Sequence, residues 1–385
     1  MEKQKVRLGE ILDNYDSLRK PLSSMQRENF KGEYPYYGAQ GIIDNVADFR
    51  CDGEYLLIAE DGENLSSRKA PIAQIAKGKF WVNNHAHIVK NNERSDIRYV
   101  CYLLNSSDIA GYVTGAAQPK LSQGNLNKIV VEIPNITIQH RIASILSTYD
   151  TLIENNTKRI RLLEKMAENL YKEWFSYNRI KNDAKVVRLT DIITITRGLS
   201  YSSEEIECNE GVDLINLKNI QSYGGFRYDG TKKFAGKYKD EQIVCNGDLV
   251  MGVTDMTQDR RTVGSVALIP DTGKLSVISA DLIKITSEIS SVFLFGMFKY
   301  GSVSKYVAQF ANGANVLHLR PKVLHNVKVL LPSLELVKEY VEKVSPIISE
   351  QNKLYVLSTQ LARQRDLLLP RLMSGKLEVK EELLE

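Results

Sequence analysis

A long internal repeat limits the possible folds of this chain more than any other feature. Residues 115–134 (GAAQPKLSQGNLNKIVVEIP) and residues 313–332 (GANVLHLRPKVLHNVKVLLP) have the same length and lie 198 positions apart. Each runs from a Gly-Ala turn through a leucine (Leu126, Leu324) into a β-rich segment that ends at a proline. The roughly 40 residues after each proline have a helical pattern. The repeat predicts two similar scaffolds in one chain.

A second pair of matching segments locates the differences between the two halves. Residues 6–11 (VRLGEI) resemble residues 187–192 (VRLTDI) at an offset of 181 positions, so the segment that follows is 17 residues longer in the second half. The contents differ too, since Tyr34-Pro35-Tyr36-Tyr37 has no counterpart. A duplicated enzyme is expected to keep its catalytic residues in both copies. A duplicated reader of two targets is expected to keep the frame and vary the reading surface.

The segment after each proline carries a heptad stripe with alternating steps of four and three residues, which is typical of a coiled coil. Nine of the ten positions in the first stripe and seven of ten in the second are apolar or aromatic. We expect the two helices to pair with each other in antiparallel orientation. The first stripe comprises Ile142, Leu146, Tyr149, Ile153, Asn156, Ile160, Leu163, Ala167, Leu170 and Trp174, and the second comprises Tyr340, Val344, Ile347, Gln351, Leu354, Ser358, Leu361, Arg365, Leu368 and Leu372.

The long helices are predicted to begin at Ser147 and Ser345. Serine is a good N-cap, and Pro346 would then occupy the first helical position, where its missing N–H costs nothing. A helix over residues 148–175 would be roughly 40 Å long, about one turn of B-DNA. The polar residues of the stripes, Asn156, Gln351 and Ser358, either fix the register of the pair or lie where the seam opens to water.

The segments between the matching regions predict two mixed α/β domains. In the first, residues 13–114, strands are expected at 55–59 and 80–89 and a helix at 97–104. In the second, residues 193–312, strands are expected near 211–220, 248–253, 264–269 and 277–286, with a helix near 292–300.

Basic, aromatic and amide side chains cluster on the predicted loops of both segments. Arg and Lys neutralise phosphates, and Arg, Asn and Gln read base edges, so the set as a whole favours DNA binding, whereas any single member fits an ordinary solvated surface better. The candidates are Arg19, Lys20, Tyr36, Tyr37, Gln40, Arg68, Lys69, His85, His87, Gln118 and Lys120 in the first half, and Arg197, Lys218, Arg227, Lys232, Lys233, Arg260, Arg261 and His318 in the second.

Several other classes lack their motifs. The formal net charge is only +4, so a nucleic-acid surface must arise from local clustering. The sequence has no GxxxxGK[ST] loop, no dinucleotide or S-adenosylmethionine glycine loop, and no Asn-Pro-Pro or Asp-Pro-Pro. Pro270-Asp271 resembles the start of a nuclease motif, but no acidic-x-Lys follows, so a turn is expected. His85-x-His87 could share a metal, but no further ligand is nearby in sequence, so none is expected.

The compartment is also predicted. The N-terminal residues are charged, and no apolar run approaches the roughly 20 residues of a membrane span. The four cysteines, Cys51, Cys101, Cys208 and Cys245, are scattered without a CxxC pair. Reduced cysteines and a cytoplasmic protein are the simplest expectation.

These features resemble the specificity subunit of type I restriction–modification systems over essentially the whole chain. The resemblance rests on Gln118-x-Lys120-Leu121, on residues 133–153 (IPNITIQHRIASILSTYDTLI), on residues 34–44 (YPYYGAQGIID) and on residues 368–377 (LLPRLMSGKL). The second repeat departs from the pattern, because His318 stands where a Gln or similar residue is expected and residues 337–339 lack the Glu-Gln pair.

The resemblance implies an α+β fold with an internal pseudo-two-fold repeat. Target-recognition domains at 1–135 and 179–332 would be separated by helical spacers at 136–178 and 333–385 that form an antiparallel coiled coil. The domains would read the two halves of a split DNA site. The helices would dock two methyltransferase subunits, which bind S-adenosylmethionine and methylate adenine, and two motor-nuclease subunits, which use ATP and Mg.

The resemblance also implies that the chain itself is not a catalyst and holds no cofactor or metal. Three alternatives remain open. The chain could be the recognition subunit of a type IIB-like methylase-nuclease, a coiled-coil scaffold that binds no DNA, or an enzyme whose active site the motifs do not reveal.

Overall fold

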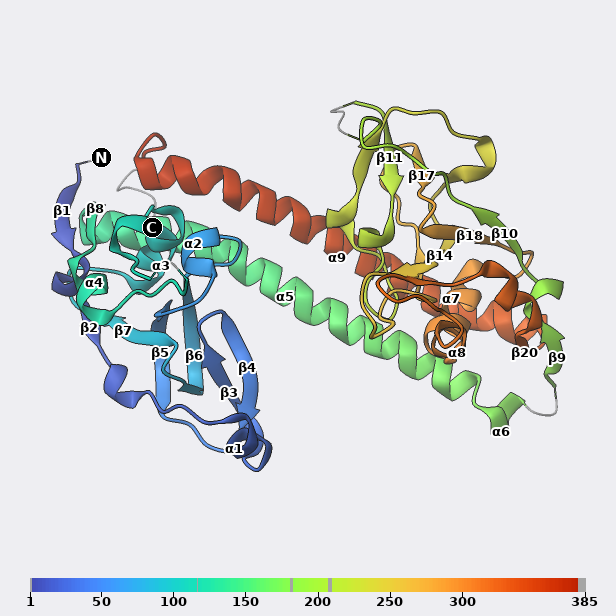
Figure 1. Ribbon diagram of the computed structural model, residues 1–385, viewed down its shortest axis with the longest axis horizontal. Coiled ribbons are helices and arrows are strands. Elements are labelled where there is room, and N and C mark those ends of the chain that lie inside the picture. Colours follow the sequence, from blue (N-terminus) through green and yellow to red (C-terminus); the bar gives the residue numbers. More distant parts are fainter. Residues whose placement is uncertain (1, 116, 181–182, 207–209, 380–385) are drawn as a thin grey trace. The chain divides into compact units, whose positions relative to one another are not determined.

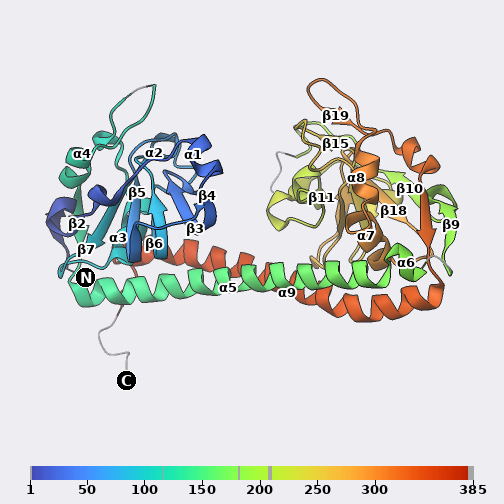
Figure 2. The same ribbon diagram turned by 90° about the horizontal axis from the view of Figure 1, so that it is seen from below.

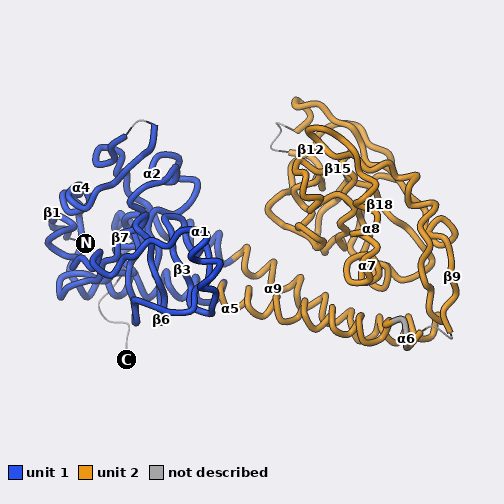
Figure 3. Tube along the Cα trace, turned by 60° about the horizontal axis from the view of Figure 1, so that its bottom comes forward, with its two compact units in different colours: residues 1–153, 361–385 blue, residues 154–360 orange. Residues whose placement is uncertain are grey.

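The computed structural model describes residues 2–115, 117–180, 183–206 and 210–379. The chain divides into two compact units, coloured separately in Figure 3. The first unit comprises residues 1–153 with 361–385, and the second comprises residues 154–360. Two long helices, α5 (Ile136–Trp174) and α9 (Leu334–Ser374), each contribute one segment to each unit. The mixed helix and strand content and the two long helices confirm that part of the predicted fold class.

The globular part of the first unit is built on a six-stranded sheet in the order β2-β7-β5-β6-β3-β4 (Figure 1). Neighbouring strands are antiparallel except β3 and β6, which are parallel. The apolar run at residues 55–59 forms the buried end of the central strand β5, whose faces contact two different cores. The strands are β2 (Leu12–Asn14), β3 (Lys31–Gly38), β4 (Gly41–Val46), β5 (Cys51–Ala59), β6 (Ala73–Val82) and β7 (Ala86–Asn91).

One face of this sheet is covered by helix α3 (Ile97–Ser106). The carboxylate of Asp96 caps the helix by accepting from the backbone N–H groups of Arg98 and Tyr99, at 2.8 and 3.1 Å. Tyr99 and Leu104 of α3 pack in one buried cluster with Leu56 and Ile58 of β5. The same cluster includes Ile142 and Leu146 of α5 and Leu372 and Met373 of α9. The first globular domain and its two helical segments therefore share one hydrophobic core.

The globular part of the second unit holds two four-stranded sheets, in the orders β10-β18-β14-β16 and β12-β11-β17-β13, and a two-stranded sheet of β15 and β19. Only β11 and β17 are parallel neighbours in these described sheets. The strands are β10 (Thr194–Arg197), β11 (Val212–Ile215), β12 (Lys232–Phe234), β13 (Ile243–Val244), β14 (Leu249–Gly252), β15 (Thr254–Asp255), β16 (Val266–Leu268), β17 (Ser276–Ile278), β18 (Leu282–Thr286) and β19 (Leu317–His318).

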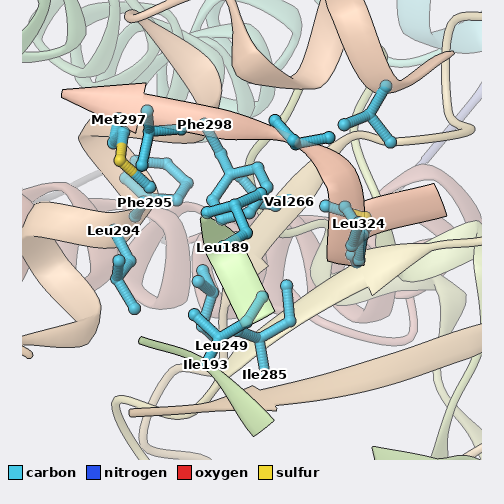
Figure 4. Close-up of a cluster of buried hydrophobic side chains, with 14 of the residues drawn as sticks. Leu189, Ile193, Leu249, Val266, Ile285, Leu294, Phe295, Met297, Phe298 and Leu324 are labelled. Atoms are coloured by element: carbon cyan, nitrogen blue, oxygen red, sulfur yellow. The ribbon is translucent and has the colours of Figure 1, made fainter. Parts of the chain in front are cut away.

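Helix α7 (Ser291–Lys299) packs against the sheet that contains β14 and β18. Figure 4 shows Leu294 and Phe298 of this helix in one cluster with Leu189, Leu249 and Ile285. This cluster continues into both long helices through aromatic contacts, and the ring centroids of Phe175 on α5 and Tyr340 on α9 are 4.9 Å apart. The second globular domain, like the first, shares its core with a segment of each helix.

In each globular domain, a strand at the start of the domain pairs with a strand at its end to form a short antiparallel pair. In the first unit β1 (Gln4–Arg7) pairs with β8 (Val130–Ile133), with Val6 opposite Val131. In the second, β9 (Lys185–Arg188) pairs with β20 (Lys328–Leu331), with Val187 opposite Val329. These positions are related by the same offsets, 181 and 198, that relate the sequence segments. The two halves of the chain thus build the same local frame.

The predicted starts of the long helices are wrong. Both helices begin before Ser147 and Ser345, and the caps are Asn135 and Ser333, which accept from the backbone N–H groups of Ile138 (3.0 Å) and Leu336 (3.4 Å). Pro346 therefore lies inside α9. Proline has no N–H to donate, so one backbone carbonyl of the preceding turn loses its helical partner. Pro346 is exposed, so that carbonyl can bond to water, while the buried residues Tyr340 and Val344 support the other face of the helix.

No helix in the described part of the chain is long and apolar enough to span a membrane.

Within each unit, the segments of α5 and α9 lie side by side and run in opposite directions (Figures 1 and 2). In the second unit, Arg159 pairs with Glu350 at 2.9 Å, and Trp174 contacts Tyr340 with ring centroids 6.3 Å apart. In the first unit, Arg365 pairs with Asp150 at 2.5 Å. Every position of the two predicted stripes is buried or half-buried. The heptad spacing therefore gives the inward faces of both helices.

Three predicted strands are too long. The expected strand at 80–89 is two strands, β6 and β7, because the chain turns at residues 83–85. The expected strand at 277–286 is likewise divided into β17 and β18, and the segment at 211–220 is strand only over β11 before a 3₁₀ turn at Leu217–Asn219. Polar turn residues lie at each interruption, such as Asn83 and Asn84, Asp281, and Asn216, but the prediction joined the apolar segments on either side of them.

Candidate nucleic-acid interface

Each globular domain carries an equivalent hairpin, residues 114–120 in the first unit and 312–318 in the second, called here the frame hairpins. Thr114 and Lys120 exchange backbone hydrogen bonds of 2.8 and 2.7 Å, and Asn312 and His318 exchange bonds of 3.1 and 2.9 Å. The residue after each hairpin is hydrogen-bonded to the end of a central strand. The N–H of Leu121 donates to the Glu60 carbonyl, and the N–H of Leu319 donates to the Val253 carbonyl in the second unit. The predicted contact residues Gln118, Lys120 and His318 are exposed on these hairpins.

A charge network holds the first frame hairpin. The Glu60 carboxylate pairs with Lys120 at 3.2 Å and with Arg19, which also pairs with Asp16 at 3.1 Å. Burial alone would raise the pKa of Glu60, but the hydrogen bond from Arg19 and the nearby charges hold that pKa below its ordinary value. The side chain of Arg19 is only 19% exposed, whereas that of Lys120 is 55% exposed. Arg19 therefore serves the network, and Lys120 keeps an accessible ammonium group.

The two predicted histidines of the first unit differ in accessibility. His87 is 1% exposed, with Nδ1 at 2.7 Å from the Asp16 carboxylate and Nε2 at 2.8 Å from the Leu121 carbonyl. The prediction that His87 contacts DNA is wrong, because both ring nitrogens are engaged inside the domain. His85 is exposed and pairs with Asp61 at 2.7 Å. Among the described residues no group of three or more His, Cys, Asp or Glu side chains could hold a metal ion.

The tyrosines of the first domain are structural. Tyr36 is 1% exposed, and its hydroxyl accepts from the Leu22 N–H at 2.8 Å, so its predicted contact with DNA is also wrong. Tyr37 is half-buried against Phe80 with ring centroids 5.4 Å apart, and burial raises the pKa of its hydroxyl. Gln40 is exposed in the turn between β3 and β4. Strand alternation buries Tyr36, and the sequence alone did not show which face the partner elements cover.

Two of the three remaining basic candidates of the first domain have side chains that are free to contact DNA. One guanidinium nitrogen of Arg68 donates to the carbonyls of Leu104, Asn105 and Ser107 at 2.9, 3.0 and 2.9 Å, so this nitrogen caps the end of α3. The residue is nevertheless exposed, and its contact with DNA stays a prediction. Lys20 and Lys69 are exposed, and their ammonium groups have no ion pair within the described ranges.

The second domain keeps three predicted basic side chains free of ion pairs in the part of the chain that the structure describes, namely Arg197, Lys218 and Arg260, all exposed. The others have partners. Arg227 pairs with Asp229 at 2.7 Å, Lys233 with Asp213 at 2.7 Å, and Arg261 with Asp259. Lys232 lies over the Tyr201 ring at 5.8 Å from its centroid. Arg227 and Arg261 are nevertheless exposed, so their pairs can exchange with phosphate.

The sequence analysis missed Asp255, which organises the loop from β14 to β16. Asp255 is 2% exposed, and its carboxylate accepts from the backbone N–H groups of Thr257, Thr262 and Val263 at 2.8, 2.6 and 3.2 Å. Burial would raise the pKa of Asp255, but these hydrogen bonds hold it below its ordinary value. The spacing Asp255-x-Thr257 is that of an Asx-turn and is the one local signal for this role.

Two of the three described cysteines, Cys51 and Cys101, are buried and pack in the domain, whereas Cys245 is exposed. Cys51, Cys101 and Cys245 are free thiols, and Cys208 lies outside the described residues. Burial raises the pKa of Cys51 to about 11 and that of Cys101 to about 12, so both remain neutral and unreactive at neutral pH.

The model of the family described as type I restriction modification DNA specificity domain matches the chain over residues 1–165 and 181–357. The chain therefore belongs to this family, as the sequence resemblance predicted.

Individual relatives agree. A type I restriction enzyme specificity subunit of Methanocaldococcus jannaschii, MjaVIII, is 23% identical over 97% of this chain and 93% of its own length. A putative type I restriction enzyme specificity subunit of Haemophilus influenzae is 35% identical, but over only 38% of this chain and 37% of that protein. The crystal structure of a type I restriction–modification S subunit from M. genitalium superimposes with a TM-score of 0.68 at 16% identity and covers 97% of this chain and 96% of that one. That likeness shows a shared fold.

Proposed function

We propose that this chain is the DNA sequence-recognition subunit of a type I restriction–modification complex and reads a bipartite, asymmetric target. Residues 1–135 and 179–332 would be its two target-recognition domains, and residues 136–178 and 333–385 its helical spacers. One observation carries the proposal. Equivalent frame hairpins rest on unlike surroundings, a charge network around Glu60 in one domain and a loop held by Asp255 in the other.

The free basic residues support a role in DNA binding. Each domain offers exposed, unpaired cations among its described residues, Lys20 and Lys69 in the first and Arg197, Lys218 and Arg260 in the second. Such side chains neutralise phosphates and position a protein on duplex DNA, while the differing loops supply contacts to bases. Because the loops that contact bases differ between the two domains, the two half-sites would differ in sequence.

The long helices would form an antiparallel coiled coil with internal pseudo-two-fold symmetry that fixes the spacing between half-sites. Their outward faces would dock two methyltransferase subunits. Support comes from exposed apolar side chains on α5, with Ile145 and Leu152 in the first unit at 36% and 44% exposure, and Leu162 and Met166 in the second at 66% and 51%. Two restriction subunits would complete the complex.

The chemistry would belong to these partners. The methyltransferase subunits would bind S-adenosylmethionine and methylate adenine at N6 after flipping it from the stack, and the restriction subunits would use ATP and Mg. This chain would supply sequence selection and would not be an enzyme itself.

The decisive test is genome-wide methylation by single-molecule sequencing in a host that expresses this chain with and without its neighbouring methyltransferase. The expected result is a split motif with N6-methyladenine on both strands, present only with both proteins. Failure of the two proteins to form a complex, together with no salt-dependent affinity of the chain for duplex DNA, would favour the scaffold alternative.

A domain exchange tests the modular part of the proposal. Replacing residues 13–114 by the corresponding segment of a relative is expected to alter one half-site and leave the other unchanged. The control is the same exchange at 193–312, which should alter the other half-site. Simultaneous change of both halves in either chimera would contradict separate reading by the two domains.

A further inference from the structure

The loop that joins β14 to β16 in the second unit, residues 253–265, is held rigidly at its base. The Asp255 carboxylate receives three backbone N–H groups and also the Thr257 hydroxyl, at 2.9 Å. The Thr262 hydroxyl donates to the Thr254 carbonyl at 3.3 Å, which closes the two ends of the loop. Thr254 in turn pairs with His318 of the frame hairpin. These hydrogen bonds fix the backbone at both ends of the loop.

Further hydrogen bonds connect the tip to neighbouring segments of the same domain. The side-chain amide of Gln258 donates to the carbonyl of Ala314 on the frame hairpin at 3.0 Å. The carbonyl of Arg261 accepts from the backbone N–H of Tyr223 at 2.7 Å and from the Ser265 hydroxyl at 2.9 Å. The loop is therefore ordered on both sides of its most exposed residues.

The tip itself turns its side chains away from the domain. Residues 256–261 are all exposed, and Met256 is 71% exposed although it is apolar. Arg260 adopts a left-handed backbone with φ of +52°, and its guanidinium has no ion pair or side-chain hydrogen bond among the described residues. Tyr223, bonded to the loop, is also left-handed, with φ of +66°. Such strained backbone at non-glycine residues concentrates at functional sites.

The equivalent loop of the first unit, residues 60–72 between β5 and β6, is different. Its Leu65 is 2% exposed, and its own left-handed residue, Arg68, is exposed but bonds through one guanidinium nitrogen to carbonyls at the end of α3. The two loops occupy the same place in the frame, since the N–H of Ala59 bonds to the Ile72 carbonyl as that of Gly252 bonds to the Ser265 carbonyl. An outward tip is thus a property of the second domain and not of the shared frame.

We infer that Met256 and Arg260 are the base-reading side chains of the second domain, with Arg260 donating to the O6 and N7 atoms of a guanine and Met256 packing on the methyl group of a thymine in the major groove. This inference rests on the proposed function. A phosphate contact needs only a mobile cation, whereas a base edge needs a guanidinium held in position beside an apolar contact. The anchored loop fixes the backbone from which the Arg260 guanidinium and the apolar Met256 side chain both project.

The test compares variants of the full chain, purified together with its methyltransferase, in the methylation of an oligonucleotide library. Arg260→Ala and Arg260→Lys are each expected to relax one guanine position of one half-site by roughly 5- to 150-fold, because Lys retains the charge but lacks the fork that binds O6 and N7 together. Met256→Ala is expected to relax one thymine position of the same half-site. Arg261→Ala is the matched control, because an exposed guanidinium that exchanges its partner Asp259 for phosphate should change affinity for all sequences alike and relax no base position.

Each other result overturns the inference. Full rescue by Arg260→Lys, or a uniform loss of affinity for all sequences, would make Arg260 a phosphate contact. Unchanged selectivity in all variants would place the loop outside the interface. Retained methylation at the other half-site shows that a variant is folded, and Met256→Leu provides a milder substitution if Met256→Ala fails this check. The wild-type chain distinguishes a failure of this inference from a failure of the proposed function. If the wild-type chain directs methylation to no motif, the proposed function itself is contradicted.

Discussion

The carboxylate of Asp150 on α5 lies 2.5 Å from the guanidinium of Arg365 on α9, and its second oxygen accepts a hydrogen bond from the hydroxyl of Tyr102 on α3. One carboxylate thus joins three helices of the first unit. Arg365 is half-buried in a stripe position where the heptad pattern calls for an apolar residue. Its burial is tolerated because Asp150 and Asp366 neutralise it, the latter at 2.8 Å.

Asp150→Asn should therefore destabilise the first unit. The amide keeps one acceptor but removes the charge opposite Arg365, so a loss of about 1–3 kcal/mol in the free energy of unfolding is expected, measured by urea denaturation. Asp366→Asn is the control, because the side chain of Asp366 is 62% exposed and should contribute less than about 0.5 kcal/mol. Equal effects of the two substitutions would show that Asp150 does not join the helices.

Asn156 gives the opposite prediction. It is 6% exposed in the stripe of α5, and its side-chain nitrogen has no hydrogen-bond partner. Asn156→Leu should raise the free energy of unfolding by about 1 kcal/mol, because it removes a buried unsatisfied donor and adds apolar contact. Asn155→Leu is the matched control, since Asn155 is exposed and should give no gain. A loss of stability in Asn156→Leu would show instead that the amide is required for the register of the helices.

The heptad stripes could be predicted from the sequence because their spacing persists over many turns, and a long periodic pattern identifies a buried face whatever lies opposite. The frame was likewise predictable, since the two offsets of the repeat directly relate Val6 to Val187 and Val131 to Val329. The helix starts were not, because a serine within a helix looks the same as a serine cap until the preceding turn is known to be buried.

The candidate interface was predicted only in part. Exposed residues such as Lys20, Lys69 and Arg260 fit the expectation. His87 and Tyr36 do not, because long-range partners decide their burial, and those partners, Leu121 and Leu22, are loop residues that no local pattern connects to them. The bonds of Arg68 to the end of α3 could not be predicted for the same reason, since its three acceptors follow it by more than thirty residues.

The loop at Asp255 predicts a specific pH dependence. The folded-state pKa of Asp255 is lowered, so its contribution to stability is present above the unfolded pKa of about 3.9 and is lost as the pH falls through the lower folded value. Asp255→Asn should thus cost about 1–3 kcal/mol at pH 7 and nearly as much at about pH 4, and the difference from the wild type should shrink below about pH 4. Urea unfolding across this pH range measures the difference in the free energy of unfolding.

Asp259→Asn is the control, because the side chain of Asp259 is 58% exposed. A difference that grows on acidification would contradict the assigned sign.

The length of the long helices should set the spacer between half-sites. Residues 153–160 of α5 and 354–361 of α9 belong to neither of the large cores that the globular domains share with the helices, so a heptad inserted into both segments would leave those cores unchanged. Seven residues add roughly 10 Å of rise and nearly restore the inward face, which corresponds to roughly two to three base pairs of B-DNA. The methylated motif should keep both half-sites and lengthen its spacer by that amount.

Insertion into α5 alone is the control, and it should disrupt the pairing of the two helices and abolish methylation. A changed half-site, or an unchanged spacer in the doubly extended chain, would show that the helices do not determine the spacing.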